Sequence, residues 1–300
     1  MRITILGGAG GMGEWFARFF KANDFGVRIV DITDKTEAVA KRLGVKFLIT
    51  DVLKMEAGAI QEVVDADILL LSVPIAVTER VIECVGPELH DGSLLMDITS
   101  VKRMPMEVME KWTTEGVEIL GTHPLFGPSA KSMRGQPVIF VPLRKGPLYE
   151  RIYELFMGNG ARVEFLTAAE HDELFGVIQG LTHFILFSFG VTLQELDFDV
   201  ERSRKFMSPM YEILIDFMGR LLHQDPHLYA EIQTNFEMGK IHKTFLTAAT
   251  RLSGLVSEGN QAEFIEELVM ARRHFGNTGR ALIDSDRVLE EKIKRSFEDA

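Results

Sequence analysis

The sequence is poor in cysteine and has no excess of basic residues. Its only cysteine, Cys84, excludes an intrachain disulfide framework and any metal site built from several cysteines, so we expect no metal and a reducing, cytoplasmic compartment. Lysine and arginine total 33 against 44 aspartates and glutamates, and the net charge of -11 would repel the phosphate backbone of a nucleic acid. No local basic stripe compensates for this charge, so we expect no nucleic-acid partner.

Long uninterrupted apolar runs are also scarce. Residues 2–7 form too short a run for the apolar part of a secretory signal. Residues 174–193 have the length of a membrane span, but polar residues such as Gln179 and His183 interrupt them. We therefore expect no membrane contact and, in this segment, a helix that is buried on most sides in a helical dimer core.

The length and the residue pattern predict two domains. Hydrophobic residues at 46% and charged residues at 26% are ordinary for a globular protein, and 300 residues exceed the usual size of one domain. Up to about residue 165, short apolar runs rich in β-branched residues alternate with amphipathic segments, which is typical of strand–helix units around a parallel sheet. The predicted strands are 2–6, 27–31, 46–48, 68–72, 94–97, 117–120, 138–141 and 162–165.

After Thr167 the strand pattern stops and helical patterns continue to the end. The predicted helices are 168–195, 201–223, 226–256, 260–275 and 280–297. We expect an α/β fold: a Rossmann-type, doubly wound and mostly parallel sheet over residues 1–166, followed by an all-helical dimerisation domain over residues 167–300. A homodimer is expected because these helices carry more apolar surface than one half-domain can bury.

A glycine-rich turn lies between the first predicted strand and the helix after it. Gly8, Gly10 and Gly13, with Gly11 and Met12 between them, match the G-x-G-x-x-G pattern of dinucleotide-binding units. In such a turn the first glycine permits a tight bend, the second lets the backbone approach a pyrophosphate, and the third allows close packing of helix on strand. The helix N-terminus then offers free N–H groups to the phosphates. A glycine-rich turn without a ligand would show the same letters.

The end of the second predicted strand adds an independent signal. Asp31 follows the glycines by about twenty residues, where an acid accepts hydrogen bonds from the ribose hydroxyls of adenosine and repels a 2′-phosphate. No arginine follows within residues 32–35, which favours NAD over NADP, while Lys35 leaves NADP as the alternative.

Three further strand ends carry polar or turn-forming residues, where open parallel sheets bind their ligands. They are Ser72-Val73-Pro74, residues 97–102 and residues 121–124. His123 is the most informative of these residues, because it is predicted just past a strand end and an imidazole there can accept a proton as hydride leaves the same substrate carbon. A loop histidine held by backbone hydrogen bonds would explain the position equally well.

Short motifs occur along the chain in a defined order. They are the glycine turn at residues 8–13, Ser72-Val73-Pro74-Ile75, Ser100-Val101-Lys102, His123-Pro124-Leu125-Phe126-Gly127-Pro128, Glu170-His171-Asp172, Ile178-Gln179-Gly180-Leu181-Thr182-His183, Ser208-Pro209, Gly219-Arg220-Leu221-Leu222 and Gln224-Asp225-Pro226. In this order and spacing the sequence resembles the prephenate dehydrogenase family over nearly its whole length.

The resemblance implies an NAD-dependent oxidative decarboxylation of prephenate to 4-hydroxyphenylpyruvate, a step towards tyrosine. His123 would accept the proton of the substrate hydroxyl, and Ser100 would orient both this hydroxyl and the histidine. Arg220 would hold a substrate carboxylate, which suits a planar guanidinium that donates two parallel hydrogen bonds. The implied cofactor contacts are Gly8, Gly10, Gly11, Met12, Gly13, Asp31, Ser72, Val73 and Pro74.

Three more residues are expected near the substrate. Gln179 and His183 are four residues apart and therefore share one helix face, which is expected to line the cleft between the domains. We expect His183 to contact the substrate, with a core histidine as the alternative, and His171 not to touch a ligand. Lys102 is expected to lend positive charge near the dianionic substrate, or else to lie in solvent.

The sequence also departs from the family. Many members have an acid where this chain has Ser129, which leaves the role of that acid open. No mutase-like domain precedes the first strand and no regulatory domain follows Ala300, so we expect a monofunctional enzyme in which inhibition by tyrosine, where present, arises at the active site.

Three other functions remain open at this point. Arogenate could replace prephenate as the substrate. A β-hydroxyacid dehydrogenase would share the architecture, but its lysine-containing helix motif is not found here. A non-catalytic NAD-binding redox sensor would use Asp31 and the glycines and leave His123 idle.

Overall fold

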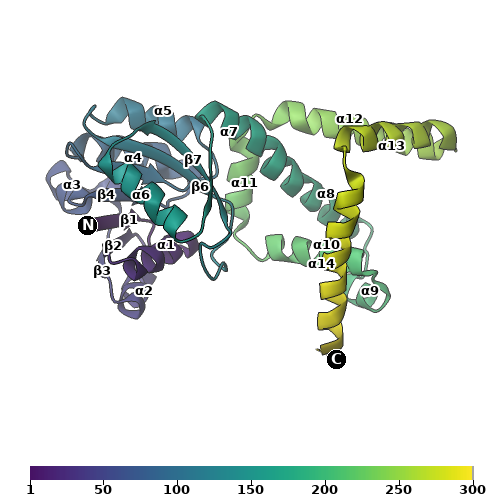
Figure 1. Cartoon of the computed structure of the whole chain (residues 1–300), viewed down its shortest axis with the longest axis horizontal. Helices are drawn as coiled ribbons and strands as arrows, with labels where there is room; N and C mark the ends of the chain where they lie inside the picture. The colour runs from purple at the N-terminus through teal and green to yellow at the C-terminus, as the bar shows by residue number, and fades with distance from the viewer. Residues whose placement is uncertain (299–300) are drawn as a thin grey trace. The chain divides into compact units, whose positions relative to one another are not determined.

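The structure is a computed structural model that describes residues 1–298, except for the side chains of Ala57 and residues 295–298. The chain divides into two compact units, Met1–Phe175 and Gly176–Ala300 (Figure 1). The predicted boundary at residues 166 and 167 precedes helix α7 (Ala168–Phe175), which belongs to the first unit because His171 and Phe175 are buried there.

An eight-stranded sheet forms the centre of the first unit. Its strand order is β3-β2-β1-β4-β5-β6-β7-β8, and all neighbours are parallel except β6 and β7. The strands are β1 (Arg2–Leu6), β2 (Gly26–Asp31), β3 (Lys46–Ile49), β4 (Ile68–Leu71), β5 (Leu94–Asp97), β6 (Glu118–Pro124), β7 (Pro137–Arg144) and β8 (Arg162–Phe165). The chain runs from β1 out to β3 and returns on the other side of β1, so the topological switch point lies between β1 and β4. The predicted Rossmann-type sheet is confirmed.

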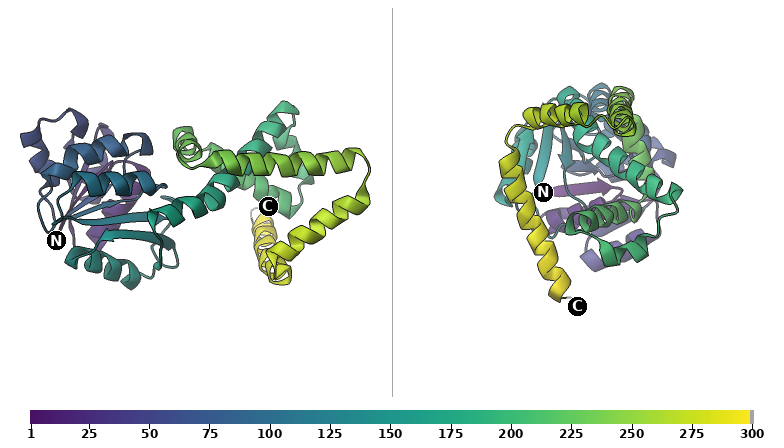
Figure 2. Two further views of the ribbon diagram at one scale, coloured as in Figure 1. Left: turned by 90° about the horizontal axis from the view of Figure 1, so that it is seen from above. Right: turned by 90° about the vertical axis from the view of Figure 1, so that its right-hand side faces the viewer.

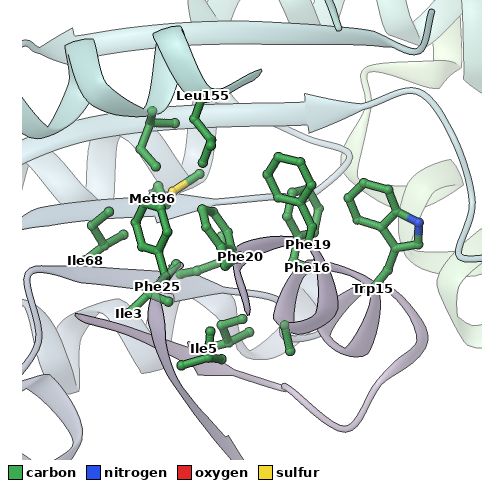
Figure 3. Close-up of a cluster of buried hydrophobic side chains, with 14 of the residues drawn as sticks. Ile3, Ile5, Trp15, Phe16, Phe19, Phe20, Phe25, Ile68, Met96 and Leu155 are labelled. Atoms are coloured by element: carbon green, nitrogen blue, oxygen red, sulfur yellow. The ribbon is translucent and has the colours of Figure 1, made fainter. Parts of the chain in front are cut away.

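Helices cover both faces of this sheet (Figure 2). Besides α7 they are α1 (Gly11–Ala22), α2 (Lys35–Leu43), α3 (Ala57–Val64), α4 (Ile75–Val85), α5 (Arg103–Trp112) and α6 (Pro147–Gly158). Helix α1 contributes Trp15, Phe16, Phe19 and Phe20, all at most 8% exposed, to one hydrophobic core with Leu155 of α6 (Figure 3). Each such buried side chain stabilises the fold by about 1.5–3 kcal/mol. The sheet edge that holds the glycine turn is therefore fixed by a rigid helix.

Strand β6 is longer than the sequence predicts and contains His123. Because β7 runs antiparallel beside it, the ladder continues past residue 120 and pairs His123 with Ile139 and Pro124 with Val138. The prediction that His123 lies in a loop is therefore wrong. A strand residue is held more rigidly than a loop residue, which suits a group that must be oriented.

All described elements of the second unit are helices (Figure 2). They are a π-helix at Gly176–Leu181, α8 (Thr182–Glu195), α9 (Val200–Ser203), α10 (Pro209–Leu222), α11 (Pro226–Asn235), α12 (Met238–Ser257), α13 (Gln261–Phe275) and α14 (Thr278–Glu298), with a short 3₁₀ turn at Arg204–Phe206. Two predicted helices are interrupted: Pro209 cannot continue a helix and instead begins α10, and the extended Phe236 separates α11 from α12.

Residues Ala168–Glu195 form a helix that is long and apolar enough, by length and composition, to span a bilayer. Only 17% of its most apolar window is buried, and α8 contributes no buried residue. Within one chain too few neighbouring helices cover side chains such as Ile185 and Val191, so the predicted burial in a dimer core stays a prediction. An apolar face exposed to this extent requires a covering surface.

Candidate functional site

The glycine turn joins β1 to α1 at the switch point. Gly7 has the positive φ of 75° that the bend requires, whereas the motif predicts this role for Gly8. Gly8 is instead required by close packing, since a Cβ there would lie 2.5 Å from the Cβ of Ile29. A Cβ on Gly13 would lie 2.2 Å from the carbonyl oxygen of Gly7, so α1 can approach the turn only with glycine at this position.

Gly10 is less crowded by the protein itself. A Cβ on this residue would meet only the Gly7 carbonyl oxygen, at 3.2 Å. Gly10 is the N-cap of α1, so it lies beside the N–H groups of the first helical turn, which includes Gly11, Met12 and Gly13. The open side of Gly10 and these N–H groups together form a cradle that fits a phosphate group.

Asp31 ends β2 beside this turn. Its Oδ2 accepts a hydrogen bond from the Ala9 N–H at 3.0 Å, and its Oδ1 accepts from the N–H and the hydroxyl of Thr33, both at 3.2 Å. These bonds fix the direction of a partly exposed carboxylate, and its oxygens retain lone pairs for the two hydroxyls of a ribose.

Ser72, Val73 and Pro74 lie on the other side of the switch point. The Ser72 N–H donates to the Leu6 carbonyl at 2.8 Å, and Pro74 caps α4. A Cβ on Gly7 would lie 2.2 Å from the Ser72 carbonyl oxygen. The residues that the sequence assigns to the cofactor are therefore brought together at one edge of the sheet.

The segment after β6, residues 125–136, is attached to α1. The Trp15 indole N–H donates to the Ala130 carbonyl at 2.7 Å, and the ring centroids of Trp15 and Phe126 are 4.8 Å apart. A Cβ on Gly11 would be 3.1 Å from Pro128. This contact was not predicted, because a tryptophan on an apolar helix face is indistinguishable in sequence from a core residue.

His123 lies in the first unit, at the end of β6, and is 3% exposed. Its Nδ1 is 2.8 Å from the Nε2 of His171, and its ring centroid is 4.8 Å from that of Phe175. Burial holds the pKa of His123 well below its ordinary value of 6.5, and the positive charges of His171 in its protonated form and of Lys102 lower it further. The imidazole is therefore neutral near pH 7 and able to accept a proton.

His171 and Asp172 continue the chain of contacts from His123. The Nδ1 of the fully buried His171 is 2.7 Å from Oδ1 of Asp172. Burial lowers the pKa of His171, and the bond to Asp172 opposes this only in part. Burial would raise the pKa of Asp172, but hydrogen bonds from His171 and from the N–H groups of Arg103 and Lys102 outweigh it, so the pKa is lowered and the carboxyl is ionised.

The contact between His171 and His123 was missed in the sequence. The motif Glu170-His171-Asp172 was recognised only as part of the family pattern. A signal was present in the spacing, because His171 and Phe175 are four residues apart and share the face of α7 on which both are buried.

Lys102 is buried, whereas the sequence left open whether it lies in solvent. Its side chain is 0% exposed, and its ammonium group donates to Asp97 Oδ2 at 2.6 Å and to oxygens of Thr99 and Val101. Burial lowers the pKa of Lys102, while Asp97 opposes this shift. Because its protein acceptors enclose the ammonium group, the alternative of a solvent-exposed Lys102 is wrong, while its positive charge near the substrate stays a prediction.

Ser100 is partly exposed after β5. Within residues 1–298 it makes no hydrogen bond to His123, whose ring partner is His171. The predicted orientation of His123 by Ser100 is therefore not supported, while a contact of Ser100 with a substrate hydroxyl stays a prediction.

The second unit contains the other predicted substrate residues. Gln179 lies in the π-helix, a rare element that occurs often at functional sites, and Gln233 holds this turn by donating to the Gly180 carbonyl at 2.9 Å. Gln179 Oε1 and His183 Nδ1 are buried and have no hydrogen-bond partner in the described part of the chain. Two buried polar atoms without partners on one helix face are typical of a site that binds a polar ligand.

Tyr229 of α11 connects this face to Arg220. Its ring is perpendicular to that of His183, with centroids 4.9 Å apart. Burial raises the pKa of the Tyr229 hydroxyl, and the positive charge of Arg220 opposes this, so the arginine lies near the tyrosine. Tyr229 was not predicted, although it follows the Gln224-Asp225-Pro226 motif by only three residues.

Among the described residues, no three His, Cys, Asp or Glu side chains are grouped to hold a metal ion.

Two protein-family models match consecutive parts of the chain. Residues 16–165 match the nucleotide-binding domain of prephenate dehydrogenase and residues 167–270 match its dimerisation domain. A probable arogenate/prephenate dehydrogenase of Methanocaldococcus jannaschii is 40% identical over 93% of this chain, and the chain spans 62% of that relative's length. The T-protein of Haemophilus influenzae is 30% identical, with 96% of this chain and 71% of the relative covered.

Solved structures share the fold. The prephenate dehydrogenase from A. aeolicus, in complex with hydroxyphenyl propionate and NAD+, has a TM-score of 0.72 and 19% identity, with 91% of this chain and 96% of the other covered. The two family matches and the relative from Haemophilus influenzae show that the chain belongs to the prephenate dehydrogenase family.

Proposed function

We propose that this protein catalyses the NAD-dependent oxidative decarboxylation of prephenate to 4-hydroxyphenylpyruvate. The observation that carries the proposal is the buried, neutral His123 at the carboxyl edge of a nucleotide-binding sheet in a member of this family. A neutral imidazole in this position is suited to remove the hydroxyl proton of a substrate whose ring carbon is being oxidised.

The first unit fits the proposed cofactor. The N–H groups at the start of α1 would face the pyrophosphate across Gly10, and Asp31 would accept hydrogen bonds from the ribose hydroxyls. The acid also disfavours a 2′-phosphate, which supports NAD over NADP. NAD, when bound, supplies the acceptor for the hydride.

His123 would act on the substrate hydroxyl, and Ser100 would donate or accept a hydrogen bond at the same hydroxyl. The hydroxyl proton moves to His123 as hydride leaves the same carbon, and the ring carboxylate departs as carbon dioxide. The electron pair of the broken carbon–carboxylate bond stays in the ring, which becomes aromatic and makes the reaction irreversible. Decarboxylation leaves a phenolate oxygen, which takes a proton back from His123 and becomes the hydroxyl of the product, so the imidazole is neutral again.

The second unit also contains groups that suit a dicarboxylate substrate. Arg220 suits a carboxylate because its guanidinium can donate two parallel hydrogen bonds, and the partnerless atoms of Gln179 and His183 offer further polar contacts. Lys102 acts in this proposal only through the buried ion pair with Asp97.

The test is a direct assay with prephenate and NAD in which the absorbance of the reduced cofactor is followed. The matched control is His123→Asn, which keeps a polar side chain but cannot act as the base. We expect turnover by the wild-type protein, none by the variant, and equal NAD affinity of both in calorimetry. Turnover by the variant at the wild-type rate would remove the assigned role of His123, and no turnover by the wild-type protein would refute the function.

Arogenate is the second candidate substrate, and the relative from M. jannaschii named as a probable arogenate/prephenate dehydrogenase favours testing it. Arogenate has an amino group where prephenate has a keto group. Comparing kcat/KM for the two substrates in the same assay decides between them; we expect the larger value for prephenate.

We further propose that the protein forms a homodimer and is inhibited by tyrosine at the active site. The match to a dimerisation domain and the exposed apolar side chains of α8, α10 and α14 support the dimer. Tyrosine shares the ring and carboxylate of the product, so it should compete with prephenate.

The two family matches meet near residue 166, which supports a division into a cofactor domain at 1–166 and a helical domain at 167–300. Sedimentation at micromolar concentration and inhibition kinetics test the dimer and the competition.

A further inference from the structure

We propose that His171 and Asp172 are positioning residues that hold His123 in the tautomer whose Nε2 carries no hydrogen. The inference rests on the proposed function for its consequence in catalysis, but the tautomer itself is a property of the protein without substrate. The three side chains form one line of contacts, with 2.8 Å between the two histidines and 2.7 Å between His171 and Asp172.

The direction of each hydrogen bond follows from the carboxylate end. The pKa of Asp172 is lowered, and its oxygens already accept the N–H groups of Lys102 at 2.8 Å and Arg103 at 2.9 Å. An ionised carboxylate can only accept, so Nδ1 of His171 must carry a hydrogen and donate it.

The remaining hydrogens are then determined. A neutral His171 with its hydrogen on Nδ1 has a bare Nε2, which must accept a hydrogen bond from Nδ1 of His123. A neutral His123 therefore has its hydrogen on Nδ1 and none on Nε2. Within residues 1–298 Nε2 of His123 has no hydrogen-bond partner, so it is the nitrogen available to a substrate hydroxyl.

The surrounding chain holds this line in place. Thr167 and Glu170 form a reciprocal cap at the start of α7, with the Thr167 N–H donating to Glu170 at 2.8 Å and the Glu170 N–H to Thr167 at 3.2 Å. Asp172 is anchored to the N-terminus of α5, and Phe175 stacks on His171 at a centroid distance of 4.5 Å. Both histidine rings are buried, so no solvent reaches Nδ1 of His123 as an alternative hydrogen-bond partner.

The same line stabilises the charge that catalysis creates. When Nε2 of His123 takes a proton, the imidazolium keeps its Nδ1 hydrogen bond to His171, and His171 keeps its bond to the Asp172 carboxylate. An acid that orients a catalytic histidine in this way acts mainly by selecting its tautomer and by stabilising its charged form.

The experiment compares His171→Gln with His171→Leu. Glutamine can accept from Nδ1 of His123 through Oε1 and donate to Asp172 through its amide, whereas leucine can do neither. In His171→Leu the required tautomer has a buried donor without an acceptor, and we expect kcat to fall about 10- to 100-fold with little change in KM. His171→Gln should recover most of kcat.

The tautomer is read directly by nitrogen NMR of protein labelled in the histidine rings, with His123 assigned from the His123→Asn spectrum. We expect a hydrogen on Nδ1 and a bare Nε2 in the wild-type protein and in His171→Gln, and loss of this single state in His171→Leu. A hydrogen on Nε2 in the wild-type protein, or the wild-type tautomer and kcat in His171→Leu, would overturn the proposal. The expected spectra in a protein that oxidises neither prephenate nor arogenate would refute the proposed function and leave the positioning role standing.

Discussion

The buried ion pair between Lys102 and Asp97 makes a strong prediction about stability. Both side chains are 0% exposed, and Oδ1 of Asp97 has no hydrogen-bond partner in the part of the chain that the structure describes. Substituting Lys102→Met removes the only cation that contacts this carboxylate among those residues. Removing one partner of a buried ion pair costs about 3–5 kcal/mol, because the other charge stays buried without compensation.

The size of the unit converts this cost into a temperature. In units of 150–250 residues, 1 kcal/mol shifts Tm by about 2–4 °C, so Lys102→Met should lower the Tm of the first unit by about 6–20 °C. The assay is thermal unfolding followed by tryptophan fluorescence. Both tryptophans of the chain, Trp15 and Trp112, lie in the first unit, so the signal reports on that unit.

The matched control is the double variant Asp97→Asn/Lys102→Met. The asparagine side chain keeps an oxygen for the Thr99 N–H, which Asp97 Oδ2 now accepts at 2.9 Å, but it carries no charge. We expect the double variant to be more stable than Lys102→Met, since replacing a whole buried pair is often nearly neutral. Two results would contradict the assignment of Lys102 to an ion pair that supports the fold. One is a decrease in Tm of less than about 2 °C in Lys102→Met, and the other is a double variant that is less stable than the single one. Well below Tm, the KM for prephenate should be unchanged in Lys102→Met, and a large rise would show a contact with substrate.

Three further predictions follow from the same geometry. Gly13→Ala places a Cβ 2.2 Å from the Gly7 carbonyl oxygen and should weaken NAD binding by at least tenfold, about 1.4 kcal/mol, in calorimetry; unchanged affinity would show that the turn does not bind the cofactor. Asp31→Ser removes the carboxylate beside the glycine turn and should raise the ratio of kcat/KM with NADP to that with NAD, and an unchanged ratio would remove Asp31 from cofactor selection. The pKa values of His123, His171 and His183 are lowered in the folded protein, so the unfolded chain binds more protons below its ordinary histidine pKa near 6.5. The free energy of unfolding should therefore fall as the pH drops below 6.5, by up to about 1.4 kcal/mol per pH unit for each histidine, with a shallower slope in His123→Asn; denaturant titrations that give equal slopes would contradict the burial of His123 in a neutral state.

The sheet could be predicted from the sequence because parallel strands buried on both faces are continuous apolar runs, as in Ile68–Leu71 and residues 94–96. The proximity of the glycine turn and Asp31 could be predicted as well, since their spacing places them at the ends of two neighbouring parallel strands. The extent of β6 could not, because it depends on the antiparallel pairing of β7, which is a long-range contact.

The side-chain partners at the site were harder to predict. Lys102 carries a charge that favours the surface, and only the tertiary structure shows that Asp97 and Thr99 enclose it. The contact of His123 with His171 joins residues 48 positions apart, and no local pattern contains it. The exposure of α8 in a single chain could not be predicted for a different reason. Its apolar residues indicate that one face is covered, but they do not show whether the covering residues belong to the same chain.

The bond from Trp15 to the Ala130 carbonyl has a consequence for how members of this family can be recombined. Residues 125–136 follow the strand that carries His123, yet they are fixed to the helix that begins at the glycine turn. A segment grafted here from a relative with a different substrate preference would lose its contact with Trp15 unless the matching face of α1 were transferred with it. Chimeras should therefore exchange residues 125–136 together with position 15, so that both sides of this contact come from the same relative.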